Sequence, residues 1–456
     1  MDFSVNSIGR RLPILFSALV LSCNGVAPSQ LRVHLAATPD ALVFAWTSKL
    51  ATGEYASIKW GEYASIKWGT AVLNSTKRAT STLFDNVYCA SNSTRVSSYA
   101  EIPVPAGGSV SFSVTTDGSS WSEPRIARNP QRGYPSRIAL WGDLGVECGG
   151  VLPPSPGFAG GRCSAGDALA SDVSAGRHEW ALHFGDTSYD MSDECGDKGD
   201  RFLDAASAWS VERPIIYTNG NHESSGPLKP YTEFTKRLAW GQTPLADASG
   251  STNVRWMSWR AGPATFFSLD PDGWIYPLVY DIMPSQFAWL ESAISRVNRT
   301  ETPWLVFAVH RAMYCTKSTD GECNSEAEAL RNGQLGLLYA LEPLLAKYGV
   351  DFYFSGHTHH VEWTWPTVRG AAVATHYDSP QATIHVQSGI AGTGPGDEFS
   401  VPQQPWEAFR DEEYWPTYGR LTFHNDSAAT YEQLFNDNGT VFKSFDVTNA
   451  MHGGGW

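Results

Sequence analysis

Residues 181–189 read ALHFGDTSY, an apolar strand-like run that stops abruptly at Asp186 and Tyr189. Four similar runs also stop at residues that bind hard metal ions: RIALW before Asp143, PIIYT before Asn221, PWLVFAV before His310, and VDFYF before His357 and His359. Strands with functional side chains at their carboxyl ends are typical of an open α/β sheet, where sites gather beyond those ends. We therefore expect the five runs to bring these side chains together.

The seven candidate ligands share a chemistry. They are two carboxylates, one amide, one phenol and three imidazoles, without a thiolate: Asp143, Asp186, Tyr189, Asn221, His310, His357 and His359. Oxygen and nitrogen donors suit hard cations, and seven of them exceed what one ion needs but suit two ions that share a carboxylate. Two adjacent ions clamp the attacking and leaving oxygens of a phosphoryl group and lower the pKa of bound water. The pattern predicts a two-metal hydrolase.

The five blocks also resemble a known family. They read Asp143-Leu144-Gly145, Gly185-Asp186-x-x-Tyr189, Gly220-Asn221-His222-Glu223, Val309-His310 and Gly356-His357-x-His359, and they look like the blocks of the metallophosphoesterases. The wider superfamily usually has a histidine where Gly145 stands. A phenol at Tyr189 in place of that histidine marks the purple acid phosphatases. The resemblance covers roughly residues 30–448.

The resemblance implies an iron(III) ion on one side of the centre and a divalent ion, Zn, Fe or Mn, on the other. The iron would take Asp143, Asp186, Tyr189 and His359, and the divalent ion would take Asp186, Asn221, His310 and His357. Asp186 would bridge the two ions, which share a hydroxide as the nucleophile. His222 follows a ligand and could protonate the leaving alkoxide. Glu223 could orient a neighbouring histidine.

The resemblance further implies hydrolysis of phosphate monoesters at acidic pH. A phosphodiesterase, a nucleotide pyrophosphatase or a phytase on the same scaffold is the alternative, and a non-catalytic secreted binding protein is a more distant one. Loops rather than the metal ligands would separate the enzymes. Some of these loop residues depart from the family: Ala312 replaces a proline, Val361 and Trp363 replace a tyrosine and an arginine, and Glu326 stands near where relatives often carry a histidine.

The chain divides by pattern into an all-β part and an α/β part. Short β-rich runs with turns predict an antiparallel β-sandwich over residues 26–127, and GEYASIKW is duplicated within it at 53–60 and 61–68. The resemblance implies that this sandwich is fibronectin-like. We read residues 125–136 as a linker. Strands then alternate with helical patterns, including one at 334–349, which predicts a catalytic domain over 137–385. A β-rich segment at 386–448 completes it. The resemblance implies a four-layer α/β/β/α sandwich for this α/β (α+β) part.

The N-terminus predicts secretion to the extracellular space. Arg10 and Arg11 precede an apolar stretch at 12–23 that is too short to span a bilayer comfortably, which indicates a signal peptide over residues 1–25. A membrane anchor or an ordinary buried segment is the alternative. Five sequons are compatible with glycosylation of a secreted protein: Asn74, Asn92, Asn298, Asn425 and Asn438.

The cysteines agree with an oxidising compartment. Cys23 falls in the predicted signal peptide, and the other six allow three disulfides. Cys315 and Cys323, close in sequence beside His310, form the best pair. Cys89 is expected to pair with one of Cys148, Cys163 and Cys195. Soft-metal binding is disfavoured because the spacings lack CxxC.

The net charge bounds the partners. The chain of 456 residues carries a formal charge of −14 at pH 7, which argues against nucleic acid and anionic membranes. The expected partner is a small phosphate ester. Because the ester is itself anionic, the positive charge that receives it must be concentrated locally, as a metal pair would do.

Overall fold

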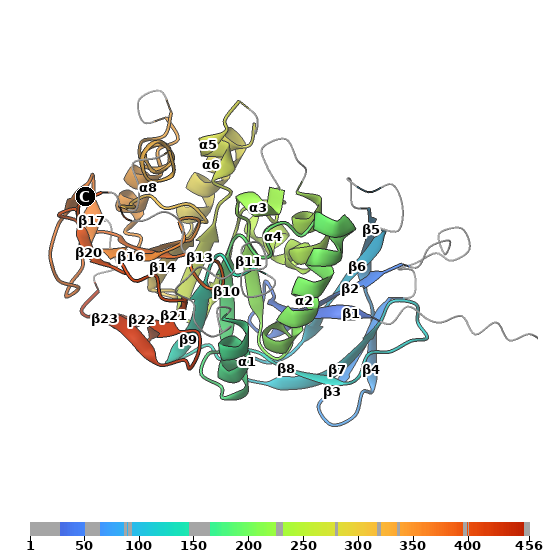
Figure 1. Ribbon diagram of the computed structural model, residues 1–456. Coiled ribbons are helices and arrows are strands. Elements are labelled where there is room, and N and C mark those ends of the chain that lie inside the picture. The colour runs from blue at the N-terminus through green and yellow to red at the C-terminus, as the bar shows by residue number, and fades with distance from the viewer. Residues whose placement is uncertain are drawn as a thin grey trace, which may run out of the picture.

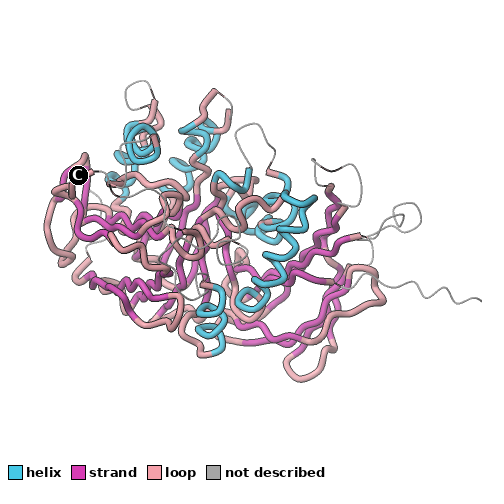
Figure 2. The backbone as a smooth tube through the Cα atoms, in the orientation of Figure 1, coloured by secondary structure: helices cyan, strands magenta, loops and turns pink. Residues whose placement is uncertain are grey.

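The computed structural model describes residues 28–50, 64–85, 89, 94–145, 165–224, 231–278, 281–316, 321–334, 338–394, 399 and 401–450. The predicted signal peptide, the first GEYASIKW copy, Cys148, Cys163 and Asn92 lie outside these residues. Figure 1 shows the N-terminal strands gathered at one side of a larger α/β body, and Figure 2 shows strands running through the middle of that body with helices on its outside. In the described part of the chain, no helix has the length and apolar character needed to cross a membrane.

The N-terminal part is a sandwich of two four-stranded antiparallel sheets. The first has the order β1 (Ser29–Leu35), β2 (Ala41–Lys49), β6 (Arg95–Pro103), β5 (Thr80–Phe84), and the second β4 (Ser75–Arg78), β3 (Ser65–Gly69), β7 (Ser109–Thr115), β8 (Arg125–Arg128). Phe44 and Phe112 from the two sheets meet edge to face, 4.5 Å apart. The linker predicted at residues 125–136 begins too early. Ala127 is buried in the sandwich core, so residues 125–128 continue as an edge strand beside β7.

The α/β body contains two sheets. The first has the order β11 (Ile215–Thr218), β10 (Trp180–Phe184), β9 (Ser136–Trp141), β21 (Thr417–Phe423), β22 (Ala429–Phe435), β23 (Val441–Val447). The second has the order β12 (Met257–Ala261), β13 (Ala264–Ser268), β14 (Trp304–Ala308), β15 (Phe352–Ser355), β19 (Ile384–Ser388), β16 (Val361–Thr364), β20 (Glu407–Arg410). A small hairpin pairs β17 (Thr367–Val368) with β18 (Ala371–Ala372). In the first sheet β9, β10 and β11 are mutually parallel, and in the second β13, β14, β15 and β19 are.

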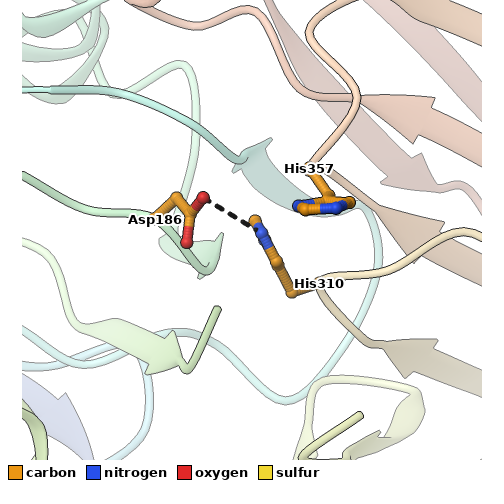
Figure 3. A group of neighbouring side chains, drawn as sticks. All are labelled: Asp186, His310 and His357. Carbon is orange, nitrogen blue, oxygen red and sulfur yellow. Dashed lines mark ion pairs between the residues drawn. The ribbon is translucent and has the colours of Figure 1, made fainter. Parts of the chain in front are cut away.

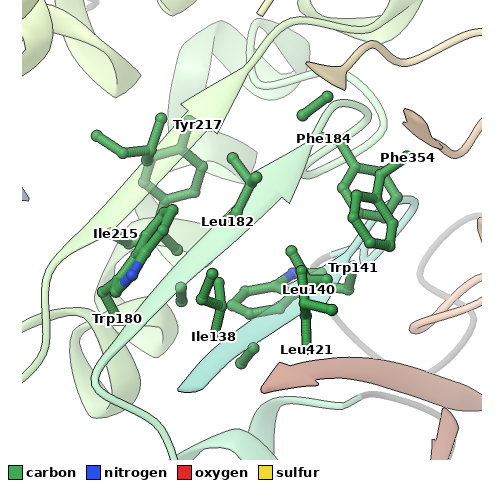
Figure 4. Close-up of a cluster of buried hydrophobic side chains, with 14 of the residues drawn as sticks. Ile138, Leu140, Trp141, Trp180, Leu182, Phe184, Ile215, Tyr217, Phe354 and Leu421 are labelled. Atoms are coloured by element: carbon green, nitrogen blue, oxygen red, sulfur yellow. The ribbon is translucent and has the colours of Figure 1, made fainter. Parts of the chain in front are cut away.

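The second sheet is apolar on both faces because its side chains alternate between two cores. Phe352 and Phe354 of β15 belong to the core shared with the first sheet, whereas Tyr353 between them belongs to the outer core. This is the two-residue period of a strand. Figure 4 shows Phe354 beside Phe184 of the first sheet, and their rings are stacked at 6.4 Å. The two sheets therefore pack face to face.

Helices cover the outer faces and confirm the predicted layers. They are α1 (Gly166–Ser174), α2 (Asp197–Ser210), α3 (Asn221–Ser224), α4 (Thr243–Ser249), α5 (Asp272–Ile275), α6 (Met283–Ile294), α7 (Ala327–Asn332) and α8 (Leu341–Tyr348), with shorter turns at η2 (Asp193–Gly196), η3 (Phe234–Leu238), η4 (Trp240–Gln242) and η5 (Glu322–Glu326). Residues of α6, α7 and α8 share the outer core with the second sheet. Of the helical pattern predicted at residues 334–349, α8 takes up only residues 341–348. Pro343 is tolerated in a first turn but not in a helix interior, so the helix cannot extend upstream.

A covalent bond and a buried ion-pair cluster join the sandwich to the body. The disulfide Cys89–Cys195 links the sandwich to the turn that precedes α2. Arg95 of β6 is fully buried and binds Asp200 of α2, with Nη2 2.6 Å from Oδ2. Arg237 also pairs with Asp200 and donates to the carbonyl of Gly196 at 3.0 Å. The disulfide and the Arg95–Asp200 ion pair thus attach the segment of residues 195–200, which follows Tyr189, to the sandwich.

Candidate metal centre

The structure places all seven predicted ligands in the segments that follow five strands. Asp143, Asp186 and Asn221 follow β9, β10 and β11 of the first sheet, with Tyr189 in the loop after β10. His310 follows β14 of the second sheet, and His357 and His359 follow β15. Because the sheets face each other, these strand ends meet at a common edge.

Three ligands form a first group by direct contact. The Tyr189 hydroxyl lies 2.9 Å from Asp143 Oδ1 and 2.9 Å from His359 Nε2, and the last two atoms are 3.5 Å apart. Burial raises the pKa of Tyr189 well above its usual value, and the charges of Asp143 and Asp186 raise it further. A phenolate at this position therefore requires a neighbouring cation.

The other four ligands form a second group. His310 Nε2 lies 3.2 Å from Asp186 Oδ2 and 3.1 Å from Asn221 Oδ1. Asp186, His310 and His357 each offer a ligand atom within 4.8 Å of the others, as Figure 3 shows. Burial alone would lower the pKa of His310, but the carboxylate of Asp186 outweighs it and raises this pKa to about 9. The negative charge of Asp186 thus favours a positive charge at the neighbouring His310 position.

Two of the histidines are oriented as metal ligands usually are. His310 Nδ1 lies 3.0 Å from the Phe184 carbonyl, and His359 Nδ1 lies 3.1 Å from the Gly394 carbonyl. A carbonyl accepts from a ring N–H, so each Nδ1 carries a proton and each Nε2 is the nitrogen that faces the ligand group. The donor set of carboxylate, phenol, amide and imidazole nitrogen therefore fits two hard ions.

Tight backbone turns present these ligands. Asp143, Asp186 and Tyr189 adopt φ angles of 60°, 55° and 52°, in the left-handed region that costs a non-glycine residue free energy. Two glycines make room for the carboxylates, because a Cβ at Gly220 would collide with Asp186 and one at Gly356 with Asp143. Strained turns of this kind are held only by well-fixed surroundings.

The comparisons with known proteins agree with this site. The calcineurin-like phosphoesterase family model matches residues 136–361, and the model for the iron/zinc purple acid phosphatase-like C-terminal region matches 382–444. Acid phosphatase type 7 of Homo sapiens is 30% identical over 327 residues, which cover 70% of this chain and 68% of that protein. The chain belongs to the purple acid phosphatase family. It is accordingly a hydrolase of the metallophosphoesterase superfamily.

Two other matches support the family and the fold. The Fe(3+)-Zn(2+) purple acid phosphatase 12 of Arabidopsis thaliana is 29% identical over 295 residues, which cover 60% of this chain and 57% of that protein. A solved purple acid phosphatase from yellow lupin (Lupinus luteus) seeds superposes with a TM-score of 0.71 at 20% identity, covering 93% of this chain and 75% of that one. The lupin match concerns the fold.

Glu223 of this purple acid phosphatase has a different position from the one predicted. The sequence suggested that it orients a histidine. Its carboxylate instead accepts hydrogen bonds from the backbone N–H groups of Asp186 (2.8 Å), Thr187 (2.9 Å) and Gly220 (2.6 Å), and from the Thr187 hydroxyl (2.7 Å). Buried backbone donors need acceptors, and these donors lie in the two turns that carry Asp186 and Asn221. Glu223 therefore fixes the turns rather than a ring.

His222 stands at the edge of the second group. Its backbone N–H donates to Asp186 Oδ1 at 3.0 Å, and its ring Nδ1 lies 3.3 Å from Asp190 Oδ1. Its side chain is 34% exposed, in contrast to the buried ligands around it. Burial lowers the pKa of His222, but Asp186 and Asp190 outweigh that effect and raise it to about 9. The ring is thus available as a proton donor at acidic and neutral pH.

Several residues of the site were missed from the sequence. Asp270 and Asp272 follow β13 as the ligands follow the neighbouring strands, so the run ATFFSL at 264–269 was a sixth signal of the same type. Arg311, next to His310, is buried with Asp272 on one side and Glu326 and His357 on the other. No local sequence signal indicated this contact, because Glu326 lies on η5 and Asp272 on α5.

The disulfide and sequon positions complete the picture. Cys315 and Cys323 are joined, and Cys89 is joined to Cys195, one of its three expected partners. Asn74, Asn298, Asn425 and Asn438 are exposed. His183 and His360, which neighbour ligand blocks, are both buried. His183 packs between the rings of Trp141 and Tyr217, so its role is in packing.

Proposed function

We propose that this chain is a secreted purple acid phosphatase that hydrolyses phosphate monoesters at acidic pH, using a centre of iron(III) and a divalent ion. The observation that carries the proposal is the pair of adjoining ligand groups. The backbone N–H of His357, a member of the second group, donates to Asp143 Oδ2 of the first at 2.9 Å. Two ions bound to groups in such contact would be close neighbours.

Each ion has a separate set of residues to hold it. Asp143, Tyr189 and His359 would hold the iron, because a buried phenol beside two carboxylates suits a trivalent cation. Asn221, His310 and His357 would hold the divalent ion, and Asp186 would serve both. Bound there, the ions would polarise the phosphoryl group, supply the nucleophile from water and offset the negative charge of the ester.

The residues of the chain supply the remaining steps. His222, protonated below a pKa of about 9, would give its Nε2 proton to the leaving alkoxide, while Asp190 accepts from Nδ1 and fixes the ring. Loss of that proton leaves His222 neutral, and solvent re-protonates it through its exposed face. Glu223 holds the turns that position Asp186 and Asn221, so the carboxylate and amide do not need to reorganise during the reaction.

Secretion is part of this proposal. Its support is the leader-like pattern at 1–25, two disulfides that join cysteines of the mature region, and four exposed sequons. Disulfides persist mainly in oxidising compartments. The proposal expects a mature N-terminus near residues 26–28, which N-terminal sequencing of the extracellular protein would check.

The activity is tested on the purified protein. We expect release of phosphate from p-nitrophenyl phosphate with an acidic optimum, loss of activity with chelator, and two ions per chain. The phenolate–iron pair should colour the protein, and Tyr189→Phe should remove the colour. Bis(p-nitrophenyl) phosphate, a nucleotide pyrophosphate and an inositol phosphate serve as rival substrates. A colourless iron protein, or faster turnover of a rival substrate, would contradict the proposal.

A further inference from the structure

His357 differs from the other two histidines of the centre in the hydrogen-bond partner of its ring nitrogen. His310 and His359 each place one ring nitrogen on a backbone carbonyl. His357 instead has Nη1 of Arg311 2.6 Å from its Nε2. A guanidinium can only donate hydrogen bonds, so in this contact His357 Nε2 is the acceptor and the ring proton lies on Nδ1.

This contact and ligation of an ion by His357 exclude each other. A neutral imidazole has one lone pair in the ring plane, and ligation through either nitrogen uses it. If Nε2 bound an ion, Arg311 would lose its acceptor. If Nδ1 bound an ion, the proton would move to Nε2 and would face the Arg311 N–H groups. Arg311 therefore competes with the second ion for His357.

Two carboxylates are placed to receive a proton on His357 Nε2. Glu322 Oε1 lies 3.5 Å and Glu326 Oε2 3.6 Å from that nitrogen. The Glu322 side chain is 44% exposed and that of Glu326 16%, so Glu326 is the better shielded acceptor. Because the carboxylates lie on the Nε2 side, Nδ1 is the nitrogen left for an ion.

A third carboxylate is placed to receive Arg311. Asp272 Oδ1 lies 3.8 Å from Arg311 Nε, slightly beyond hydrogen-bond distance, and both side chains are buried. Within the described residues neither atom has a hydrogen-bond partner. Buried polar groups are normally paired, and each unpaired one carries a desolvation cost. A small retreat of the guanidinium toward Asp272 would pair both atoms and free His357.

Resting on the two-ion centre proposed above, we propose that Arg311 and Glu326 together tune how His357 binds the second ion: Arg311 competes with the ion, and Glu326 is a positioning residue that supports it. As the ion binds His357 Nδ1, the ring proton leaves Nδ1 for solvent and Nε2 takes one up, so the ring stays neutral. Arg311, whose Nη1 donates to both His357 and Glu326 Oε2, exchanges these partners for Asp272. Glu326 Oε2 then accepts from the new Nε2–H. Carboxylate–histidine–metal triads of this kind orient ligands in many metal sites.

The test measures how strongly the holoenzyme retains its divalent ion during dialysis against increasing chelator, with zinc and iron counted per chain. Arg311→Met removes the competitor, so this variant should retain the ion at a roughly tenfold higher chelator concentration. A factor of this size corresponds to the free energy of a hydrogen bond to a charged group. Glu326→Gln removes the acceptor and should lose the ion at about tenfold less. Iron content and colour should stay unchanged in both variants.

Two matched variants separate this exchange from simple charge effects and from damage to the fold. Glu322→Gln makes the same charge change at the same distance from His357 and should alter retention less than Glu326→Gln. Arg299→Met removes another largely buried arginine, which pairs with Asp351 just before β15, away from the strand ends that carry the ligands, and should leave retention unchanged. Equal losses in the two glutamate variants, or tighter retention in both arginine variants, would overturn the proposal.

A crystal structure of the zinc-loaded protein gives a direct readout. We expect Arg311 Nε on Asp272 and His357 Nε2 on Glu326. Arg311 still on His357 Nε2, with two ions bound, would overturn the exchange while leaving the proposed function intact. Wild-type protein that binds only one ion would overturn the proposed function itself, so the two failures are distinguishable.

Discussion

The two sheets build their sides of the metal centre by different means. On the first sheet the ligands are fixed by backbone. Asp143 and Asp186 lie in left-handed turns, and Glu223 accepts hydrogen bonds from the backbone N–H groups of Asp186 and Thr187. On the second sheet the ligand His357 lies beside side-chain charges, the buried guanidinium of Arg311 and the partly buried carboxylate of Glu326. The first side fixes geometry, and the second side adjusts electrostatics. Variants on the two sides should therefore fail differently.

The strongest test of the first side is Asp186→Asn. Losing the carboxylate that both ions are proposed to share should release at least one ion and cost several kcal/mol of transition-state stabilisation, about 10³-fold or more in kcat. Metal analysis and turnover of p-nitrophenyl phosphate measure both effects. Asp190→Asn, in the same loop, is the control and should keep both ions. An Asp186→Asn protein with both ions and a tenth of its activity would break the comparison.

His222→Ala tests the exposed edge of the same side. General acid catalysis contributes about 10²–10⁴-fold, so this variant should lose that much on alkyl phosphates. It should lose clearly less on p-nitrophenyl phosphate, because an activated phenolate departs without a proton. Asn221→Ala, by contrast, should lose the second ion and slow both substrates together. Equal losses for His222→Ala on both substrates, with both ions present, would assign His222 to phosphate positioning.

Removing each disulfide tests how much it contributes to the free energy of unfolding on its side of the centre. Cys89–Cys195 spans 106 residues and holds the first side from the sandwich, whereas Cys315–Cys323 spans 8 residues beside the second. In the chain-entropy account, a long closed loop gives more stability, so the double Cys→Ser variant of Cys89 and Cys195 should lose about 2–4 kcal/mol and that of Cys315 and Cys323 roughly 2 kcal/mol less. Denaturant unfolding measures both. Equal losses of free energy of unfolding would show that native-state strain or residual structure in the unfolded chain, rather than loop length, sets the contribution of each disulfide.

The sequence predicts the first side better than the second for a physical reason. A strand run that ends at Asp143 or Asp186 is a local pattern, and parallel strands bring such ends together regardless of the intervening loops. The Arg311–Asp272–Glu326 contacts join three separate elements, so only tertiary packing reveals them. The hydrogen bonds of Glu223 were missed for the same reason, because the Thr187 N–H that donates to its carboxylate lies 36 residues away in the chain.

Local rules also explain where element boundaries were missed. The linker prediction weighed the prolines and glycine after residue 129 and overlooked the short run Arg125–Arg128, an edge strand in which only Ala127 is buried. The helix predicted at 334–349 ignored Pro343. Both corrections follow from residues that the sequence already displayed. The resemblance to a family supplied what local rules could not, namely the expected assignment of the seven ligands to an iron ion and a divalent ion.

The smallest expected effect concerns a buried acidic pair on the second side. Burial raises the pKa of Glu362 to about 7, and burial together with the charge of Glu362 raises that of Glu407 to about 7. Both pKa values lie above the ordinary 4.5, so the folded protein binds these protons more tightly than the unfolded chain. The stability they contribute is complete below pH 4.5 and is lost as the pH rises through 7.

Glu407→Gln should therefore flatten the pH dependence of stability. The melting temperature of the wild type should fall between pH 5 and pH 8, and the variant should fall less, by roughly 1 kcal/mol of free energy of unfolding at pH 8. Glu412→Gln is the matched control, because Glu407 and Glu412 both pair with Arg410 but the Glu412 side chain is 63% exposed. This variant should leave the slope unchanged. Identical slopes in wild type and Glu407→Gln would mean that the pair stays charged when folded. The electrostatic role of the second side would then rest on Arg311 and Glu326 alone.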